Sequence, residues 1–328
     1  MKLIAKISLF NLIFLSLLFV NAVAQPTDNI EDGVQLFEAK QYEAAKRYFE
    51  MQKASDPTNH QALYYLGRIE YDNNQLDEAV DYFKKSIELE RENSTYYLWL
   101  GRAYLQKLQN ANFFEKAILS GRVKESFQKS VKYDSSNVEA MTHLSNYYLN
   151  APSIAGGSKK KALAQAQEII RYDAKQGKFL IAQIYARQKK YDQALIEYRE
   201  LLALYPDDIA IYYSKGVMHQ QAEQYDAAFA AFEKALENDP KAMHVIYQIG
   251  RTGVFSGQRL DRAIECMKIY VVHEPGEGMP SLDAAHWRLG MLYEKAEKAG
   301  LAKQAYEKAQ AINPQEEKYK EALANLQN

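Results

Sequence analysis

Three separate stretches of the chain line up with themselves at a shift of 34 residues. The recurring residues are small, aromatic or Pro: Gly67 recurs at Gly101, Ala45 at Ala79, Phe49 at Phe83, Ala194 at Ala228, Tyr198 at Phe232 and Pro206 at Pro240. A fixed period of this length is typical of an array of helix–turn–helix units. Each unit is too small to bury its own apolar face, so the units stack into one continuous core. The period therefore predicts a scaffold that presents a surface, and not an enzyme built around a pocket.

The recurring residue types each have a physical role in such an array. Gly costs about 1 kcal/mol relative to Ala inside a helix, yet five glycines lie inside predicted helices: Gly67, Gly101, Gly216, Gly250 and Gly290. That cost is tolerated where the missing side chain lets a neighbouring helix approach closely. The aromatic residue four positions after the recurring Ala lies on the same helical face and fills the space beyond. Proline in the closing turn disfavours helix at the preceding residue and so ends the second helix.

Several units carry most of the recurring small, aromatic and Pro residues. They are Leu66-Gly67, Ala79 and Phe83 in residues 60–93; Ala182, Tyr185, Ala194, Tyr198 and Pro206 in residues 175–208; Gly216, Ala228, Phe232 and Pro240 in residues 209–242; and Leu289-Gly290, Tyr293, Ala302, Tyr306 and Pro314 in residues 283–316. The pattern resembles the tetratricopeptide repeat, whose unit has Leu-Gly and Tyr in its first helix, Ala and an aromatic residue in its second, and Pro in the closing turn. The resemblance covers essentially the whole mature chain. It implies an all-α fold, an α-α superhelix of about eight helix–turn–helix units.

The same resemblance implies a solenoid over residues 25–316 with a capping helix after it. We expect the eight units at about residues 26–59, 60–93, 94–137, 138–174, 175–208, 209–242, 243–282 and 283–316, the first helix beginning near Asp28. The cap covers residues 317–328, where Tyr319, Ala322 and Leu323 stand at helical spacing with charged residues between them. A polar outer face of that kind keeps the end of an array soluble.

Three segments depart from the period. The segment around Gln109 to Ser120 lengthens the third unit by ten residues, which predicts a longer first helix or an inserted turn. Residues 151–158 contain Gly-Gly-Ser but lack the spacing of a phosphate-binding loop, so we interpret them as a structural turn. Residues 275–280 are rich in Pro and Gly and are predicted to act as a hinge.

Residues 1–24 are interpreted as a secretory signal peptide. Lys2 and Lys6 precede an apolar run over residues 7–20, and Ala22-Val23-Ala24 places small residues where signal peptidase reads them. We expect cleavage after Ala24, no stable membrane insertion afterwards, and an exported protein in the periplasm or outside the cell. The alternative is an uncleaved membrane anchor, although the run is shorter than the roughly 20 apolar residues of a spanning helix.

The net charge and the number of cysteines limit the partners and the covalent links that the chain can have. The formal net charge is −1, and removing the leader with its two lysines makes it −3, so no general electrostatic attraction for nucleic acid exists. Cys266 is the only cysteine, which excludes an internal disulfide. We interpret it as a buried, inert thiol in a second helix, with pairing between two chains as the alternative. The sequence does not specify an oligomeric state.

The sequence contains no recognisable catalytic or metal-binding motif. The six His residues are scattered without the spacing of metal ligands. A Gly-x-Ser-x-Gly elbow, a His-Glu-x-x-His motif and paired Cys motifs are all absent. We therefore expect no catalysis, no metal and no cofactor. A third and weaker hypothesis is an enzyme that acts through the inserted segments. Detectable turnover by the purified chain would be needed to support it.

The resemblance implies that the first helices line a concave groove, with contact residues just before and after the recurring Gly. On this basis we expect a peptide to contact Tyr64, Arg68, Tyr71, Arg102, Asn146, Gln183, Tyr213, Gln220, Tyr247, Arg251 and Trp287. Arg68 and Arg102 are one period apart and should lie in one row on adjacent first helices. Arg side chains bind carboxylates bidentately and Tyr rings pack against side chains, which suits an extended peptide.

Alternatives remain open for these residues and for the function. Arg68 and Arg102 can pair with acids of a neighbouring helix, the Tyr residues can pack between repeats, and Trp287 can pack against the terminal helix. The main prediction is an exported scaffold for protein–protein interaction, with envelope or secretion assembly inferred only by family analogy. The alternative is a periplasmic accessory protein that binds a small ligand or glycan among Tyr64, Tyr213, Tyr247 and Trp287.

Overall fold

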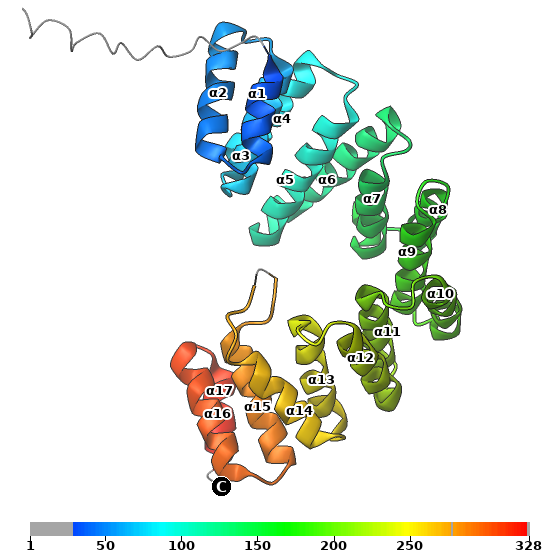
Figure 1. The fold of residues 1–328 in the computed structure, drawn as a ribbon, viewed down its shortest axis with the longest axis vertical. Coiled ribbons are helices and arrows are strands. Elements are labelled where there is room, and N and C mark those ends of the chain that lie inside the picture. Colours follow the sequence, from blue (N-terminus) through cyan, green and yellow to red (C-terminus); the bar gives the residue numbers. More distant parts are fainter. Residues whose placement is uncertain (1–28, 277, 327–328) are drawn as a thin grey trace, which may run out of the picture. The chain divides into compact units, whose positions relative to one another are not determined.

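The computed structural model describes residues 29–276 and 278–326, and Figure 1 shows how their helices follow one another. The predicted signal peptide and Asp28 lie outside the described residues. The first described helix begins at Ile30 and is capped by Asn29, whose side-chain oxygen accepts a hydrogen bond from the Glu31 backbone N–H at 3.1 Å. An Asn at this position satisfies one of the free N–H groups of a helix start.

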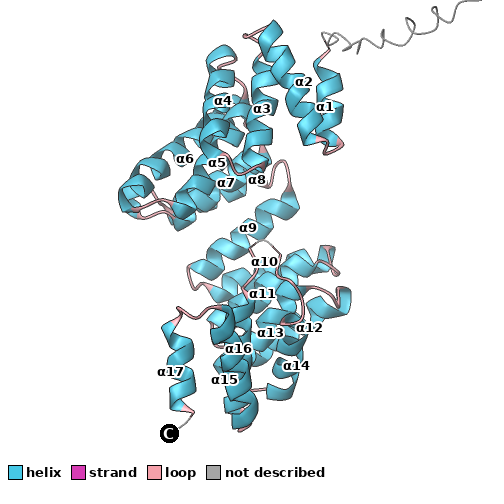
Figure 2. Cartoon of the chain, turned by 90° about the vertical axis from the view of Figure 1, so that its left-hand side faces the viewer, coloured by secondary structure: helices cyan, strands magenta, loops and turns pink. Residues whose placement is uncertain are grey.

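Within the described residues every regular element is a helix, as Figure 2 shows. The helices are α1 (Ile30–Glu38), α2 (Tyr42–Ser55), α3 (His60–Asp72), α4 (Leu76–Leu89), α5 (Ser94–Asn110), α6 (Phe113–Tyr133), α7 (Val138–Asn150), the short 3-10 helix η1 (Ser153–Ala155), α8 (Lys159–Ile169), α9 (Ala174–Arg187), α10 (Tyr191–Leu204), α11 (Ile209–Gln221), α12 (Tyr225–Asn238), α13 (Met243–Ser256), α14 (Leu260–Tyr270), α15 (Leu282–Lys295), α16 (Ala299–Ile312) and α17 (Glu317–Asn325). The predicted all-α fold is confirmed. Odd numbers from α1 to α15 are the first helices of eight pairs, even numbers are the second helices, and α17 follows the last pair.

The chain divides into two compact units between Gly157 and Ser158. The N-terminal unit holds α1 to α7 with η1, and the C-terminal unit holds α8 to α17. Within each unit, a first helix packs against its own second helix, and that second helix packs against the first helix of the next pair. The helices of the predicted fourth repeat are divided between the units, with α7 in the N-terminal unit and α8 in the C-terminal unit.

The recurring glycines allow the two helices of their pairs to pack closely. A Cβ atom placed on Gly67 would lie 2.7 Å from the Phe83 ring, and one placed on Gly216 would lie 2.5 Å from the Phe232 ring. Both rings are fully buried. An added methyl group has no room at these distances, because protein interiors are close-packed. The predicted reason for Gly in the first helices is therefore confirmed.

The insertion in the third unit lengthens both of its helices. α5 extends to Asn110, and α6 begins at Phe113 and spans 21 residues. A capping box starts α6: the Asn112 side chain accepts from the Glu115 N–H, and the Glu115 carboxylate accepts from the Asn112 N–H at 3.1 Å. The expected longer first helix is thus only part of the extension, because most of the added residues join the second helix.

Cys266 is fully buried in α14, and burial raises the pKa of its thiol to about 12. The reactive thiolate is therefore a very small fraction at pH 8. We expect the native protein to leave Ellman's reagent unreacted over an hour, and the chain unfolded in guanidinium chloride to react with one equivalent. Rapid and complete reaction of the native protein would contradict the buried, inert thiol.

The terminal helix α17 is attached through Asp283 at the start of α15. The Tyr319 hydroxyl donates to the Asp283 carboxylate at 2.8 Å, and the Asn313 amide donates to it at 3.1 Å. Burial alone would raise the pKa of Asp283. Hydrogen bonds from Ser281, Tyr319 and Asn313 outweigh that effect and lower the pKa to about 2. The ionised carboxylate therefore stabilises the folded C-terminal end.

This carboxylate makes a pH-dependent contribution to stability. Because its folded pKa lies below the ordinary 3.8, the contribution is complete above about pH 4 and is lost as the pH falls to about 2. We expect Asp283→Asn to lower the free energy of unfolding by about 2 kcal/mol at pH 7, and the difference from the unmodified protein to disappear near pH 2. Paired denaturation curves across that range measure it, and a difference independent of pH would contradict the assignment.

Candidate functional site

The predicted contact residues all lie on first helices. In the N-terminal unit they are Tyr64, Arg68 and Tyr71 on α3, Arg102 on α5 and Asn146 on α7; in the C-terminal unit they are Gln183 on α9, Tyr213 and Gln220 on α11, Tyr247 and Arg251 on α13, and Trp287 on α15. We call the surface formed by α1, α3, α5 and α7 the first-helix face of the N-terminal unit. The two sets belong to different units.

Trp99 on α5 brings the two arginines of the first-helix face together. The guanidinium carbon of Arg68 lies 3.4 Å from the centroid of the Trp99 ring, and that of Arg102 lies 3.9 Å from it. The Tyr71 ring meets Trp99 edge-on, with centroids 5.4 Å apart. Guanidinium groups stack favourably on indole faces. The period of 34 thus placed Arg68 and Arg102 correctly as neighbours, while the aromatic ring between α3 and α5 was missed.

Arg68 has no carboxylate at ion-pair distance within the described part of the chain. It donates to the Tyr64 hydroxyl at 2.8 Å, its guanidinium carbon lies 5.1 Å from the Phe37 ring centroid, and its buried Nε has no hydrogen-bond partner there. Burial raises the pKa of the Tyr64 hydroxyl although Arg68 acts in the opposite direction, so Tyr64 remains a neutral partner. The charge of Arg68 is in contact with aromatic rings and has no counter-ion among the residues that the structure describes.

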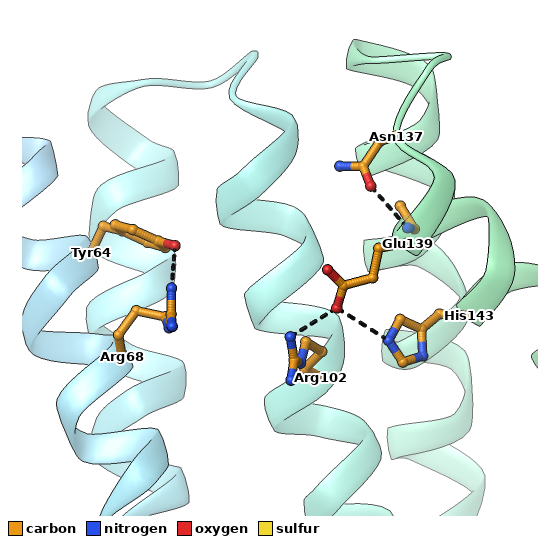
Figure 3. Close-up of polar contacts among 7 residues, drawn as sticks. Tyr64, Arg68, Arg102, Asn137, Glu139 and His143 are labelled. Carbon is orange, nitrogen blue, oxygen red and sulfur yellow. Dashed lines mark hydrogen bonds and ion pairs between the residues drawn. The ribbon is translucent and has the colours of Figure 1, made fainter. Parts of the chain in front are cut away.

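Arg102, in contrast, already has a counter-ion on the next first helix. Its Nη1 lies 2.8 Å from Oε1 of Glu139 on α7, and the same oxygen lies 3.7 Å from Nε2 of His143 (Figure 3). Burial lowers the pKa of His143 against the opposing effect of Glu139. Arg102 therefore pairs with an acid of a neighbouring helix, which is the alternative interpretation that the sequence left open. Half of the Glu139 side chain is exposed, so a competing carboxylate can approach this pair.

A cavity of about 830 Å³ opens beside His143, between α5, α6, α7 and the loop around η1. The His143 ring stacks on the buried Phe127 ring with centroids 4.8 Å apart, and both residues line the cavity. Asn146, a predicted contact residue, also lines it. Most of the other lining residues are apolar. The N-terminal unit therefore combines a charged aromatic cluster on its first-helix face with an apolar cavity that α6 and the η1 loop help to line.

The predicted residues of the C-terminal unit mostly bond to each other or to their neighbours. Gln220 donates to the Thr252 hydroxyl at 2.9 Å, and both side chains are buried. Three of the others make contacts between first helices: Gln183 with Ser214 at 3.4 Å, the Tyr213 hydroxyl with Gln248 at 3.2 Å, and Tyr247 with the Arg288 guanidinium. Arg251 bonds to Gln248 of its own helix at 3.4 Å, and Trp287 contacts the Tyr319 ring of α17. Trp287 therefore packs against the terminal helix, as one of the alternatives from the sequence stated.

Among the described residues no group of three or more His, Cys, Asp or Glu could hold a metal ion. Over the same residues, no helix is long and apolar enough to cross a bilayer. The arrangement offers guanidiniums, aromatic rings and an open apolar cavity, which can bind a carboxylate-bearing chain.

Comparisons with protein families and curated proteins point to one repeat type. Models described as tetratricopeptide repeat match residues 181–247 and 284–316, and a model described as TPR repeat matches residues 67–107. The chain is 25% identical over 237 residues to the BBSome complex member BBS4 of Bos taurus, which covers 71% of this chain and 43% of that protein. It is 40% identical over 52 residues to an Hsp70-Hsp90 organising protein of Plasmodium falciparum, covering 16% of this chain and 9% of that protein. The chain spans less than half the length of either relative.

Solved structures show the same fold. The APC/C hetero-tetramer Cut9-Hcn1 superposes with a TM-score of 0.54 at 15% sequence identity, covering 90% of this chain and 55% of that chain. The C-terminal part of a TPR repeat-containing protein from Cytophaga hutchinsonii gives a TM-score of 0.50 at 15% identity, covering 90% of this chain and 99% of that one. At this level of identity the likeness concerns the fold alone.

Proposed function

Because this chain is a tetratricopeptide repeat protein, we propose that it is an exported scaffold that holds a protein partner on the first-helix face of its N-terminal unit. Its repeats and its relatives support a protein–protein interaction scaffold. Proteins of this fold are generally scaffolds without catalytic activity.

The observation that carries the proposal is the environment of Arg68. Arg68 is half-buried, its buried Nε has no hydrogen-bond partner and it has no carboxylate within the described residues, so a partner that supplies a carboxylate would stabilise it. A carboxylate of a bound chain would restore the bidentate pair that Arg favours. Arg102, whose partner Glu139 is half exposed, lies on the same Trp99 ring and offers a second position for an acidic residue. The partner that fits this face is an acidic protein segment.

The cellular setting is part of the proposal. Lys2, Lys6, the apolar run and Ala22-Val23-Ala24 support export with cleavage after Ala24. We place the mature protein in the periplasm of a bacterium with an outer membrane, in the assembly of envelope or secretion machinery. Intact-mass measurement of protein recovered from source cells tests the first step: a chain beginning at Gln25 is expected, and a chain retaining residues 1–24 would contradict export by cleavage.

The interaction is tested by affinity capture from the envelope fraction with mature protein, residues 25–328. The unmodified protein is compared with Arg68→Gln/Arg102→Gln and with the control Arg47→Gln/Arg91→Gln, which changes two exposed arginines elsewhere in the N-terminal unit. Only variants of equal melting temperature are compared. We expect a protein that the unmodified and control forms retain and the first variant loses.

Two other outcomes count against the proposal. If all three forms capture the same proteins, Arg68 and Arg102 are structural and the partner binds elsewhere. If none captures a protein, the alternative of a small ligand or glycan gains support.

A further inference from the structure

The apolar cavity of the N-terminal unit is built by two of the three segments that depart from the repeat period, the α5–α6 insertion and the loop around η1. The lengthened α5–α6 pair contributes Leu108 and Phe113, and the loop after α7 contributes Pro152 and Ile154. Two of these side chains are almost fully open to solvent: Phe113 is 83% exposed and Ile154 is 98% exposed. Large apolar side chains grouped at the edge of a cavity are typical of an interaction site.

The walls of the cavity are held in place without a bound partner. The Tyr147 hydroxyl donates to the Ala155 carbonyl at 2.7 Å and lies 3.0 Å from the Ser120 hydroxyl, which ties α7 to the loop and to α6. The capping box of Asn112 and Glu115 fixes the start of α6, where Phe113 is placed. A preformed site of this kind loses little conformational entropy on binding.

The charged groups at the cavity are of one sign. Its lining contains no Asp or Glu, and besides the Tyr147 phenol its ionisable side chains are Lys116 and His143. Burial lowers the pKa of His143, so Lys116 is the cation there at neutral pH. Lys116 has no ion-pair partner within the described residues. Charge complementarity therefore favours an occupant that carries a carboxylate next to its apolar part.

The polar groups of the lining favour a peptide as that occupant. The side-chain amide of Asn146 has no hydrogen bond within the described residues, and it is half-buried in the cavity wall. A free carboxamide can donate to a main-chain carbonyl and accept from a main-chain N–H at once. An amphiphile with a hydrocarbon tail would leave both of these groups unsatisfied, which is unfavourable in an apolar site.

We propose that the cavity between α5, α6, α7 and the η1 loop anchors a bulky apolar side chain of an acidic peptide segment, with Lys116 binding a neighbouring carboxylate and Asn146 the peptide backbone. The proposal rests on the proposed function, because it assigns chemistry to the partner of the same unit. It adds a site that the repeat period does not predict.

The test uses peptides selected from a library of random displayed dodecapeptides on mature protein, residues 25–328. Selected peptides are measured by fluorescence polarisation against the unmodified protein and two matched pairs of variants. Phe113→Ala changes a residue that lines the cavity, and Phe114→Ala changes its neighbour, which is 80% exposed and does not line it. Lys116→Glu reverses the charge at the cavity, and Lys132→Glu reverses an exposed charge at the other end of α6.

We expect the selected peptides to share a bulky apolar residue close to Asp or Glu. Phe113→Ala and Lys116→Glu should each weaken their binding about tenfold, and the two control variants should change it less than twofold. Added salt should weaken binding to the unmodified protein and not to Lys116→Glu.

The opposite results separate this proposal from the function on which it rests. Peptides that bind Phe113→Ala as tightly as the unmodified protein, but lose affinity for Arg68→Gln/Arg102→Gln, would overturn the anchor site and leave the interaction face in place. The absence of any selected peptide would overturn both. If no peptide is selected and sodium dodecanoate binds saturably in a manner that depends on Phe113, the cavity is an amphiphile site and the peptide proposal is wrong.

Discussion

Phe232→Ala is expected to lower the free energy of unfolding of the C-terminal unit by about 3–5 kcal/mol, the range for an aromatic side chain removed from a close-packed core. Phe232 is fully buried on α12, and its ring lies against Gly216 of α11. Denaturation in urea, followed by circular dichroism, measures the loss. Phe255→Ala is the control in the same unit, because its ring is 48% exposed, and it should cost less than about 1 kcal/mol.

The reason for the loss is the fit between Gly216 and Phe232, and a double variant tests that fit. Gly216→Ala alone should destabilise the unit by about 1–3 kcal/mol through overpacking, even though Ala is the better helix former. Combined with Phe232→Leu, whose smaller side chain leaves room for the methyl group, its cost should fall. Strictly additive effects of the two substitutions would contradict direct packing between them.

Trp99→Ala is expected to have an effect of similar size in the N-terminal unit. Trp99 is 9% exposed, its ring contacts Tyr71, and both Arg68 and Arg102 stack on it. Its removal should lower the free energy of unfolding by about 3–5 kcal/mol. It should also release the two guanidiniums, so capture of the partner should fail at temperatures where the variant is still folded.

Two controls separate the loss of stability from the loss of the surface. Trp99→Phe keeps an aromatic ring for the guanidiniums and should retain most of the capture. Phe114→Ala removes an exposed ring of the same unit and should change stability by less than about 0.5 kcal/mol. If Trp99→Ala remained folded and captured the partner normally, the cluster around Trp99 would not be the contact surface.

The fold follows from the sequence because its main determinants recur. Gly67 and Phe83 are 16 residues apart, and so are Gly216 and Phe232. In both cases this separation places the aromatic ring of the second helix against the glycine of the first helix, which has no side chain. Because Arg68 and Arg102 are one period apart, the sequence also predicted that they are neighbours on adjacent first helices. Their different environments could not be predicted, because the Glu139 that pairs with Arg102 is 37 residues further along the chain.

Trp99 was missed because the contact face was read only from residues flanking the recurring Gly. A signal was available: Trp99 stands one period after Tyr65, so both are aromatic residues at the same position of a first helix. The cavity could not be found in this way. It requires Phe113 from the lengthened α6 and Ile154 from the η1 loop, and these segments depart from the period in two different units.

The most direct test of the central claim is site-specific photocrosslinking in the source cell. A photoreactive benzoylphenylalanine replaces Tyr71, beside Trp99 on the first-helix face, or Lys84, an exposed residue of the second helix α4. The proposed scaffold predicts a covalent adduct with one protein partner at position 71 and none at position 84. Adducts at position 84 with none at position 71 would show that the partner binds the second helices, and would contradict the first-helix face as the binding surface.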